Sequence, residues 1–62
     1  MKKPRCKLIG ENGNIYNIVG IVRRVLYAAG LEVEAQEMTN RILNSKSYEE
    51  ALHIITEYVE VH

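Results

Sequence analysis

A chain of 62 residues is long enough for one small domain but leaves little room for a core together with a deep catalytic cavity. With 47% hydrophobic and 26% charged residues, the composition is that of a globular protein, and no apolar run approaches the ~20 residues of a membrane-spanning helix. The eight basic and eight acidic side chains cancel, which argues against a generally basic nucleic-acid-binding protein.

The start of the chain and its cysteine content bear on the compartment. Residues 1–4 have the basic beginning of a signal peptide, but no apolar segment or small-residue cleavage site follows. Cys6 is the only cysteine, so it makes no internal disulfide and alone builds no zinc site. We therefore expect a cytoplasmic protein with residues 1–62 in a single domain, no cofactor and no membrane contact. Its stability must rest on helix packing or self-association.

Polar and apolar side chains alternate over residues 4–9, which predicts a half-buried strand. Asn12 and Gly13 follow, and this pair is typical of a type I′ turn, in which both central residues take positive φ. The apolar pair after the turn would form a short return strand at about residues 14–16. The sequence therefore predicts an N-terminal β-hairpin.

Apolar side chains then recur at helical spacing in three segments. Asn17 is the expected N-cap of the first helix, and Gly30 its left-handed C-terminal residue. Ser47, followed three residues later by Glu50, has the pattern of a capping box for the third helix. Together with the hairpin, these segments predict an α+β domain that is more than half helical. The predicted helices span residues 18–29, 32–44 and 48–60.

The inner faces of the predicted helices are expected to form one core. Its expected members are Val22, Leu26, Met38, Ile42, Leu52 and Ile55. On the second helix, Glu37 and Arg41 have the i,i+4 orientation that favours an ion pair within the helix.

Charge is unevenly distributed along the chain. Residues 1–31 carry six basic side chains against one acidic side chain, whereas residues 32–62 carry two basic against seven acidic. Such asymmetry indicates a polyanion-binding end or a head-to-tail contact between protomers, unless the two halves pair within the fold or their charges stay in solvent. The sequence leaves these alternatives open.

No set of residues has the pattern of a catalytic or metal centre. Glu50 and His53 have the spacing found in carboxylate-bridged metal sites, but no second pair of this kind supplies further ligands. Cys6 lies on the expected inner face of the strand, where a thiol is usually packed and unreactive. Gly10 and Gly13 match neither the Walker pattern nor the dinucleotide fingerprint. We therefore expect a protein that is not an enzyme.

One face of the first predicted helix combines a glycine, two cations and an aromatic side chain, namely Gly20, Arg23, Arg24 and Tyr27. Guanidinium groups suit phosphate or carboxylate partners, and tyrosine is enriched at interfaces. This face is the expected binding site for an unidentified protein or a second copy of the chain, unless it is a plain polar helix face. The alternative is a nucleic-acid-binding patch that also includes the basic strand. That patch would consist of Lys3, Arg5, Lys7, Arg23 and Arg24.

Several segments also carry a family resemblance. They include Cys-Lys-Leu-Ile-Gly-Glu-Asn-Gly-Asn-Ile-Tyr-Asn at residues 6–17, Ser-Tyr-Glu-Glu-Ala-Leu at 47–52 and Glu-Tyr-Val-Glu-Val at 57–61, with shorter matches at 29–31 and 37–38. Over nearly its whole length the chain resembles small uncharacterised proteins encoded in phages and mobile elements of Gram-positive bacteria. The resemblance implies an accessory or regulatory role in a bacterial cell, exerted by binding a host or phage protein, and it brings no catalytic residues. The predicted function is a non-catalytic protein-binding module.

Overall fold

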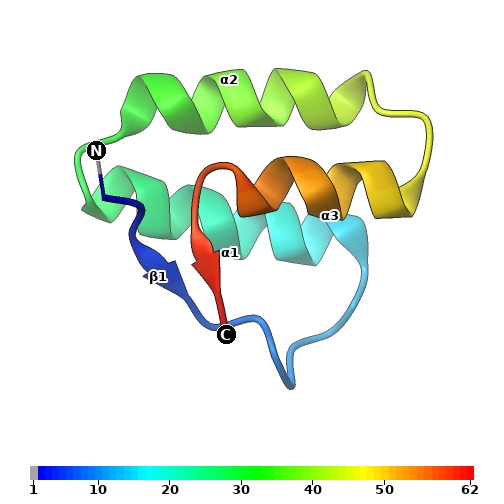
Figure 1. Cartoon of the computed structure of the whole chain (residues 1–62), viewed down its shortest axis with the longest axis horizontal. Helices are drawn as coiled ribbons and strands as arrows, with labels where there is room; N and C mark the ends of the chain where they lie inside the picture. The colour runs from blue at the N-terminus through cyan, green and yellow to red at the C-terminus, as the bar shows by residue number, and fades with distance from the viewer. Residues whose placement is uncertain (1) are drawn as a thin grey trace.

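A computed structural model describes residues 2–62, which form three helices and two short strands (Figure 1). In chain order the elements are β1 (Arg5–Cys6), α1 (Ile15–Ala28), α2 (Glu32–Leu43), α3 (Tyr48–Thr56) and β2 (Glu60–Val61). About 57% of the chain is helical, which confirms the predicted α+β class and the three helices. None of the helices within residues 2–62 has the length and apolar character needed to cross a membrane.

The predicted β-hairpin is wrong. β1 pairs with β2, and the two strands run parallel, with Arg5 opposite Glu60 and Cys6 opposite Val61. The expected return strand at residues 14–16 is instead the N-cap and first turn of α1. The sheet therefore joins the beginning and the end of the described chain rather than two neighbouring segments (Figure 1).

The chain turns earlier than predicted, at Gly10 rather than at Gly13. The Glu11 amide donates to the Leu8 carbonyl at 3.1 Å, which closes a tight turn with Gly10 as its third residue. Gly10 has a φ of 91°, as the third position of a type II turn requires, whereas the φ of Gly13 lies outside the left-handed region. The Asn-Gly pair thus follows the turn instead of forming it.

Asparagine side chains then direct the chain into α1. The side chain of Asn12 accepts from the Asn14 amide at 2.8 Å, and that of Asn14 accepts from the Tyr16 amide at 2.9 Å. Asn14 is therefore the N-cap, three residues before the predicted Asn17. Ile15 lies half-buried in the first helical turn. Because short amide side chains suit caps as well as turns, the same residues that suggested a hairpin start a helix.

The end of α1 and the start of α3 agree with the sequence. Gly30 has a φ of 77°, and its amide donates to the Tyr27 carbonyl at 3.0 Å. The Leu31 amide donates to the Leu26 carbonyl at 2.8 Å, which completes a Schellman motif. Ser47 caps α3, because its hydroxyl accepts from the amide three residues later at 3.0 Å.

Helix α3 ends at Thr56, four residues before the predicted end at residue 60. A continued helix would keep residue 60 away from the first strand. Instead the Glu60 amide donates to the Pro4 carbonyl at 2.8 Å, and Tyr58 and Val59 are buried in the turn between α3 and β2. Backbone pairing with β1 and burial of two large side chains thus replace the last helical turn.

The core lies between the three helices and β1, and α1 contacts α2, α3 and β1. Val22, Leu26, Met38 and Ile55 are buried as predicted, whereas Ile42 and Leu52 are only half-buried at the core's edge. In Figure 1 the strands lie toward the left, while the start of α1, the end of α2 and the start of α3 lie together at the right. The buried side chains are Cys6, Ile18, Val22, Leu26, Ala35, Met38, Ala51, Ile54, Ile55, Tyr58 and Val59.

Candidate functional site

An open groove of about 570 Å³ lies where the start of α1, the end of α2 and the start of α3 meet. Helix α1 contributes Ile15 and Val19 to its wall, α2 contributes Ile42, and α3 contributes Ala51. In Figure 1 these helix ends lie away from the two strands. The groove is thus formed by three segments that only the tertiary fold brings together.

Large apolar side chains stand exposed along this groove. Tyr16, Leu43 and Tyr48 all line it, and their exposed fractions are 79%, 70% and 46%. The Tyr48 hydroxyl donates to the Gly13 carbonyl, which fixes the ring against the loop before α1. Exposed apolar side chains gathered around a hollow are typical of interaction sites. The groove therefore offers apolar area that a partner would remove from water.

Gly20 lies within the continuous helix α1 and lines the groove. A Cβ atom added there would meet no heavy atom of residues 2–62 within 4 Å, and the φ of Gly20 lies outside the left-handed region. Neither close packing nor backbone conformation therefore requires a glycine at this position. Because glycine has no side chain, the backbone of α1 is accessible from the groove at this position.

Arg23 also lines the groove, and Tyr27 holds it in place. The Arg23 Nη2 atom donates to the Tyr27 hydroxyl at 3.2 Å, and the guanidinium carbon lies 5.7 Å from the centre of the ring. This is the geometry of a cation–π contact. The Nε atom of Arg23 is buried and has no hydrogen-bond acceptor among residues 2–62. The groove is thus lined by a cation whose guanidinium is positioned by an aromatic ring.

The predicted binding face is therefore divided by the structure. Gly20 and Arg23 line the groove, and Tyr27 supports Arg23 from outside it. Arg24 is exposed but does not belong to the groove lining. Sequence reasoning missed Lys46, which lies in the loop between α2 and α3 and adds a second cation to the groove.

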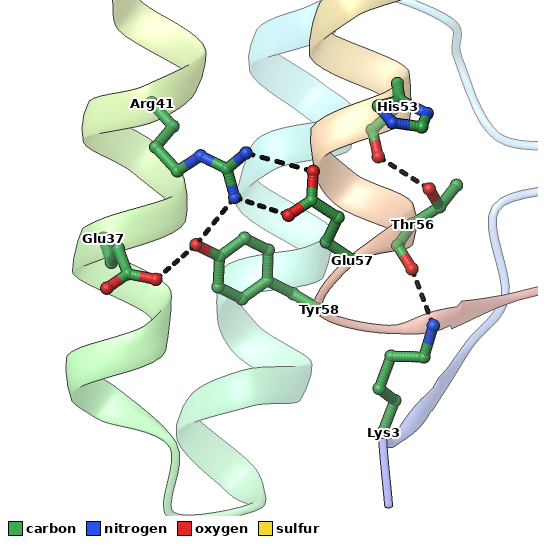
Figure 2. Close-up of polar contacts among 7 residues, drawn as sticks. All are labelled: Lys3, Glu37, Arg41, His53, Thr56, Glu57 and Tyr58. Atoms are coloured by element: carbon green, nitrogen blue, oxygen red, sulfur yellow. Dashed lines mark hydrogen bonds and ion pairs between the residues drawn. The ribbon is translucent and has the colours of Figure 1, made fainter.

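The five cations of the predicted nucleic-acid patch have different surroundings. The Lys3 ammonium donates to the Thr56 carbonyl at 2.9 Å, at the end of α3 (Figure 2). Arg5 lies opposite Glu60 in the sheet register, so an acidic residue accompanies the basic strand. Lys7 and Arg24 are exposed, as is Arg5, whereas Arg23 is engaged with Tyr27. Two of the five cations thus have contacts within the fold.

A polar network missed by the sequence analysis joins α2 to the turn after α3 (Figure 2). Arg41 binds the Glu57 carboxylate through two nitrogen–oxygen contacts of 2.8 and 3.0 Å. Arg41 also donates to the Tyr58 hydroxyl at 3.2 Å, and that hydroxyl donates to Glu37. The predicted Glu37–Arg41 pair is therefore bridged by Tyr58, and the ion pair of Arg41 is with Glu57.

These contacts shift the ionisation of the groups involved. The hydrogen bond from Arg41 lowers the pKa of Glu57, and the same contact raises the pKa of Arg41. Burial, followed by the hydrogen bond to Glu37, raises the pKa of the Tyr58 hydroxyl. The network therefore favours the ion pair and a protonated tyrosine, as expected for a contact that holds elements together.

The structure also places the thiol and the side chains that could bind a metal ion. Cys6 is buried in the core, and burial raises the pKa of its thiol, which disfavours the reactive thiolate. Within residues 2–62, no three histidine, cysteine, aspartate or glutamate side chains gather closely enough to hold a metal ion. A smaller hollow of about 390 Å³ lies between the turn near Ile9 and α3, with Leu8, Leu52 and Val61 in its lining.

Comparisons with protein-family models, with curated protein sequences and with solved structures each found no match. The resemblance to phage and mobile-element proteins therefore stays a prediction.

Proposed function

We propose that this domain is a non-catalytic protein-binding module that uses the groove between α1, α2 and α3. The observation that carries the proposal is the open groove of about 570 Å³ with Tyr16, Leu43 and Tyr48 exposed along it. Removing apolar area from water is the main source of association energy, and a few large side chains usually supply most of it. Tyrosine suits this role, since it combines a large apolar ring with a hydroxyl that can form a hydrogen bond to water or to a partner.

The groove suits a short segment of a partner chain. Its walls come from three helices, so an inserted side chain would be covered on several sides. Peptides bind such grooves by placing a few anchor side chains between helices. We propose an accessory or regulatory role in a bacterial cell, in keeping with the resemblance to phage and mobile-element proteins. We place this role in the cytoplasm, where a lone buried thiol such as Cys6 stays reduced.

The test is a selection of random peptides of about 12 residues on the immobilised domain, followed by affinity measurements on the variant Gly20→Trp. The added indole would occupy open space in the groove, because nothing lies near the Cβ position of residue 20. The matched control is Gln36→Trp, which adds the same ring at an exposed position of α2 outside the groove. Both variants are first compared with the wild type by thermal melting.

We expect the selected peptides to bind Gly20→Trp at least about tenfold more weakly than the wild type and to bind Gln36→Trp unchanged. Peptides that bind both variants equally well, or a selection that enriches no sequence, would show that the groove is not the binding site. Binding of labelled nucleic acid that disappears in an Arg5→Ala/Lys7→Ala variant would instead support the nucleic-acid alternative.

A further inference from the structure

We propose that the groove recognises an acidic peptide segment of a partner protein, in which a carboxylate beside apolar anchor side chains is bound by Arg23 and Lys46. This inference rests on the proposed function, because it names the chemistry of the partner for the same groove.

The charge of the groove is the first reason. Arg23 reaches it from α1 and Lys46 from the loop between α2 and α3. Within the described part of the chain, no aspartate or glutamate lines the groove. The chain as a whole has as many acidic as basic side chains, so this local imbalance is not a consequence of overall charge. A partner with a carboxylate would complement the groove, whereas a basic partner would be repelled.

The second reason is a comparison between two arginine–tyrosine pairs of this fold. Arg41 lies 5.7 Å from the centre of the Tyr58 ring and donates to its hydroxyl at 3.2 Å. Arg23 has the same two distances to Tyr27. Arg41, however, also binds a carboxylate through both terminal nitrogens, and Arg23 has no carboxylate partner among residues 2–62.

Within the described residues, the Arg23–Tyr27 pair thus lacks the carboxylate that the Arg41–Tyr58 pair has in Glu57. The Arg23 guanidinium is already positioned by the ring. A guanidinium pairs with a carboxylate through two parallel hydrogen bonds, and charge-assisted bonds of this kind are the strong ones. Because Tyr27 limits the freedom of the side chain in advance, less entropy is lost when the anion binds.

The third reason is the position of Gly20. It precedes Arg23 by three residues on the same helix, so the two lie on one face. The bare backbone at Gly20 lets a partner segment approach α1 closely, next to the cation. Apolar contact with Val19 and Ile42 and ionic contact with Arg23 can then come from one short segment.

The experiment repeats the peptide selection on three proteins: the wild type, Arg23→Gln and the control Arg24→Gln. Arg24 is the neighbouring arginine on α1 and is exposed outside the groove. We expect peptides from the wild type and from Arg24→Gln to combine aspartate or glutamate with leucine or aromatic residues. We expect peptides selected on Arg23→Gln to lose the acidic preference and keep the apolar one.

One synthetic peptide from the wild-type selection is then used to measure the coupling free energy between Arg23 and the peptide carboxylate. Loss of Arg23, or replacement of the peptide carboxylate by an amide, should weaken binding about tenfold to a hundredfold, and the double change should add little further. Lys46→Gln is a second variant and should also weaken binding. Because Lys46 is exposed in a loop, this substitution should leave the stability of the fold unchanged. Melting curves establish that each variant is folded.

The outcomes separate this inference from the proposed function. Peptides that need an open groove but show no acidic preference, or whose acidic preference survives Arg23→Gln and Lys46→Gln, would overturn the inference and leave the groove as a binding site. Peptides indifferent to Gly20→Trp would overturn both. A dimer seen by sedimentation and abolished by Gly20→Trp would make a second copy the occupant and overturn the acidic partner. Binding of single-stranded DNA that is lost in Arg23→Gln would also overturn the acidic partner, since it would make a nucleic acid the ligand of Arg23.

Discussion

Arg41 and Glu57 are sixteen residues apart in the chain, yet their side chains meet in two parallel nitrogen–oxygen contacts. The pair joins α2 to the turn that follows α3, and Tyr58 adds its hydroxyl to the same guanidinium (Figure 2). Both charged side chains remain 42% and 44% exposed, so salt should screen their attraction. The buried ring of Tyr58 supplies the apolar part of the contact.

The network predicts how stability depends on pH. The pKa of Glu57 is below its ordinary value of 4.5, so its contribution is present above about pH 4.5 and is lost as pH falls through the folded-state pKa. The pKa of Tyr58 is above its ordinary value of 10.0, so its contribution is present below about pH 10 and is lost as pH rises further. Urea denaturation from about pH 3 to about pH 11 should show a plateau between these limits.

Tyr58→Phe tests the alkaline limit, because it keeps the buried ring and removes the hydroxyl. We expect a loss of about 1–2 kcal/mol at neutral pH and a shallower decline above pH 10 than in the wild type. A parallel decline of both proteins above pH 10 would mean that the Tyr58 hydroxyl is not coupled to folding.

Leu26 and Leu43 form a matched pair for testing the core against the groove. Leu26 is fully buried, whereas Leu43 is 70% exposed at the groove. Leu26→Ala should cost about 2–5 kcal/mol, and Leu43→Ala should change the free energy of unfolding by no more than about 0.5 kcal/mol. Chemical denaturation measures both values. A large loss for Leu43→Ala would place that side chain in the core and remove it from the groove.

Alanine substitutions at Gly10 and Gly13 test where the chain turns. Gly10→Ala should destabilise the domain by about 1 kcal/mol, because φ is 91° there. Gly13→Ala should be nearly neutral, since its backbone is not left-handed and the added Cβ would lie 3.4 Å from the Tyr48 hydroxyl, an ordinary contact. If Gly13→Ala were destabilising and Gly10→Ala neutral, the turn would lie at Asn12-Gly13 instead.

Gly20→Ala should stabilise the domain. The new methyl group would meet open space, and alanine is favoured over glycine inside a helix by about 1 kcal/mol. Gly30→Ala is the contrasting variant and should destabilise, because φ is 77° at that position. A destabilised Gly20→Ala would show that residue 20 packs against another segment.

The helices could be predicted from the sequence because their signals are local. Apolar spacing located all three, and the chemistry of Gly30 and Ser47 located two of their ends. The alternation over residues 4–9 indicated the first strand, although that strand is only Arg5–Cys6. Its pairing could not be predicted, because the partner of Arg5 is Glu60, at the far end of the described chain. Asn12 and Asn14 suit both a hairpin turn and a helix start, and only the packing of Ile15 against the core separates the two.

The candidate site could likewise be predicted only where its residues lie on one helix. Gly20 and Arg23 share a helix face that the sequence alone indicates. Lys46, Leu43 and Tyr16 come from three segments, and nothing local indicates that these segments meet. For the same reason the i,i+4 spacing pairs Arg41 with Glu37, its neighbour in the helix, whereas the fold pairs Arg41 with Glu57.

The parallel pairing of β1 with β2 also limits when the sheet can form during synthesis. Residues 4–6 are translated well before residues 60–62, but the Pro4 and Cys6 carbonyls accept from the Glu60 and His62 amides at 2.8 and 2.9 Å. The emerging first strand therefore stays unpaired until about fifty further residues have been translated. Helices α1 and α2 contact each other and are complete by residue 43, so they can pack while the sheet is still open. The sheet therefore cannot close before residues 60–62, which follow all three helices in the chain, have been translated.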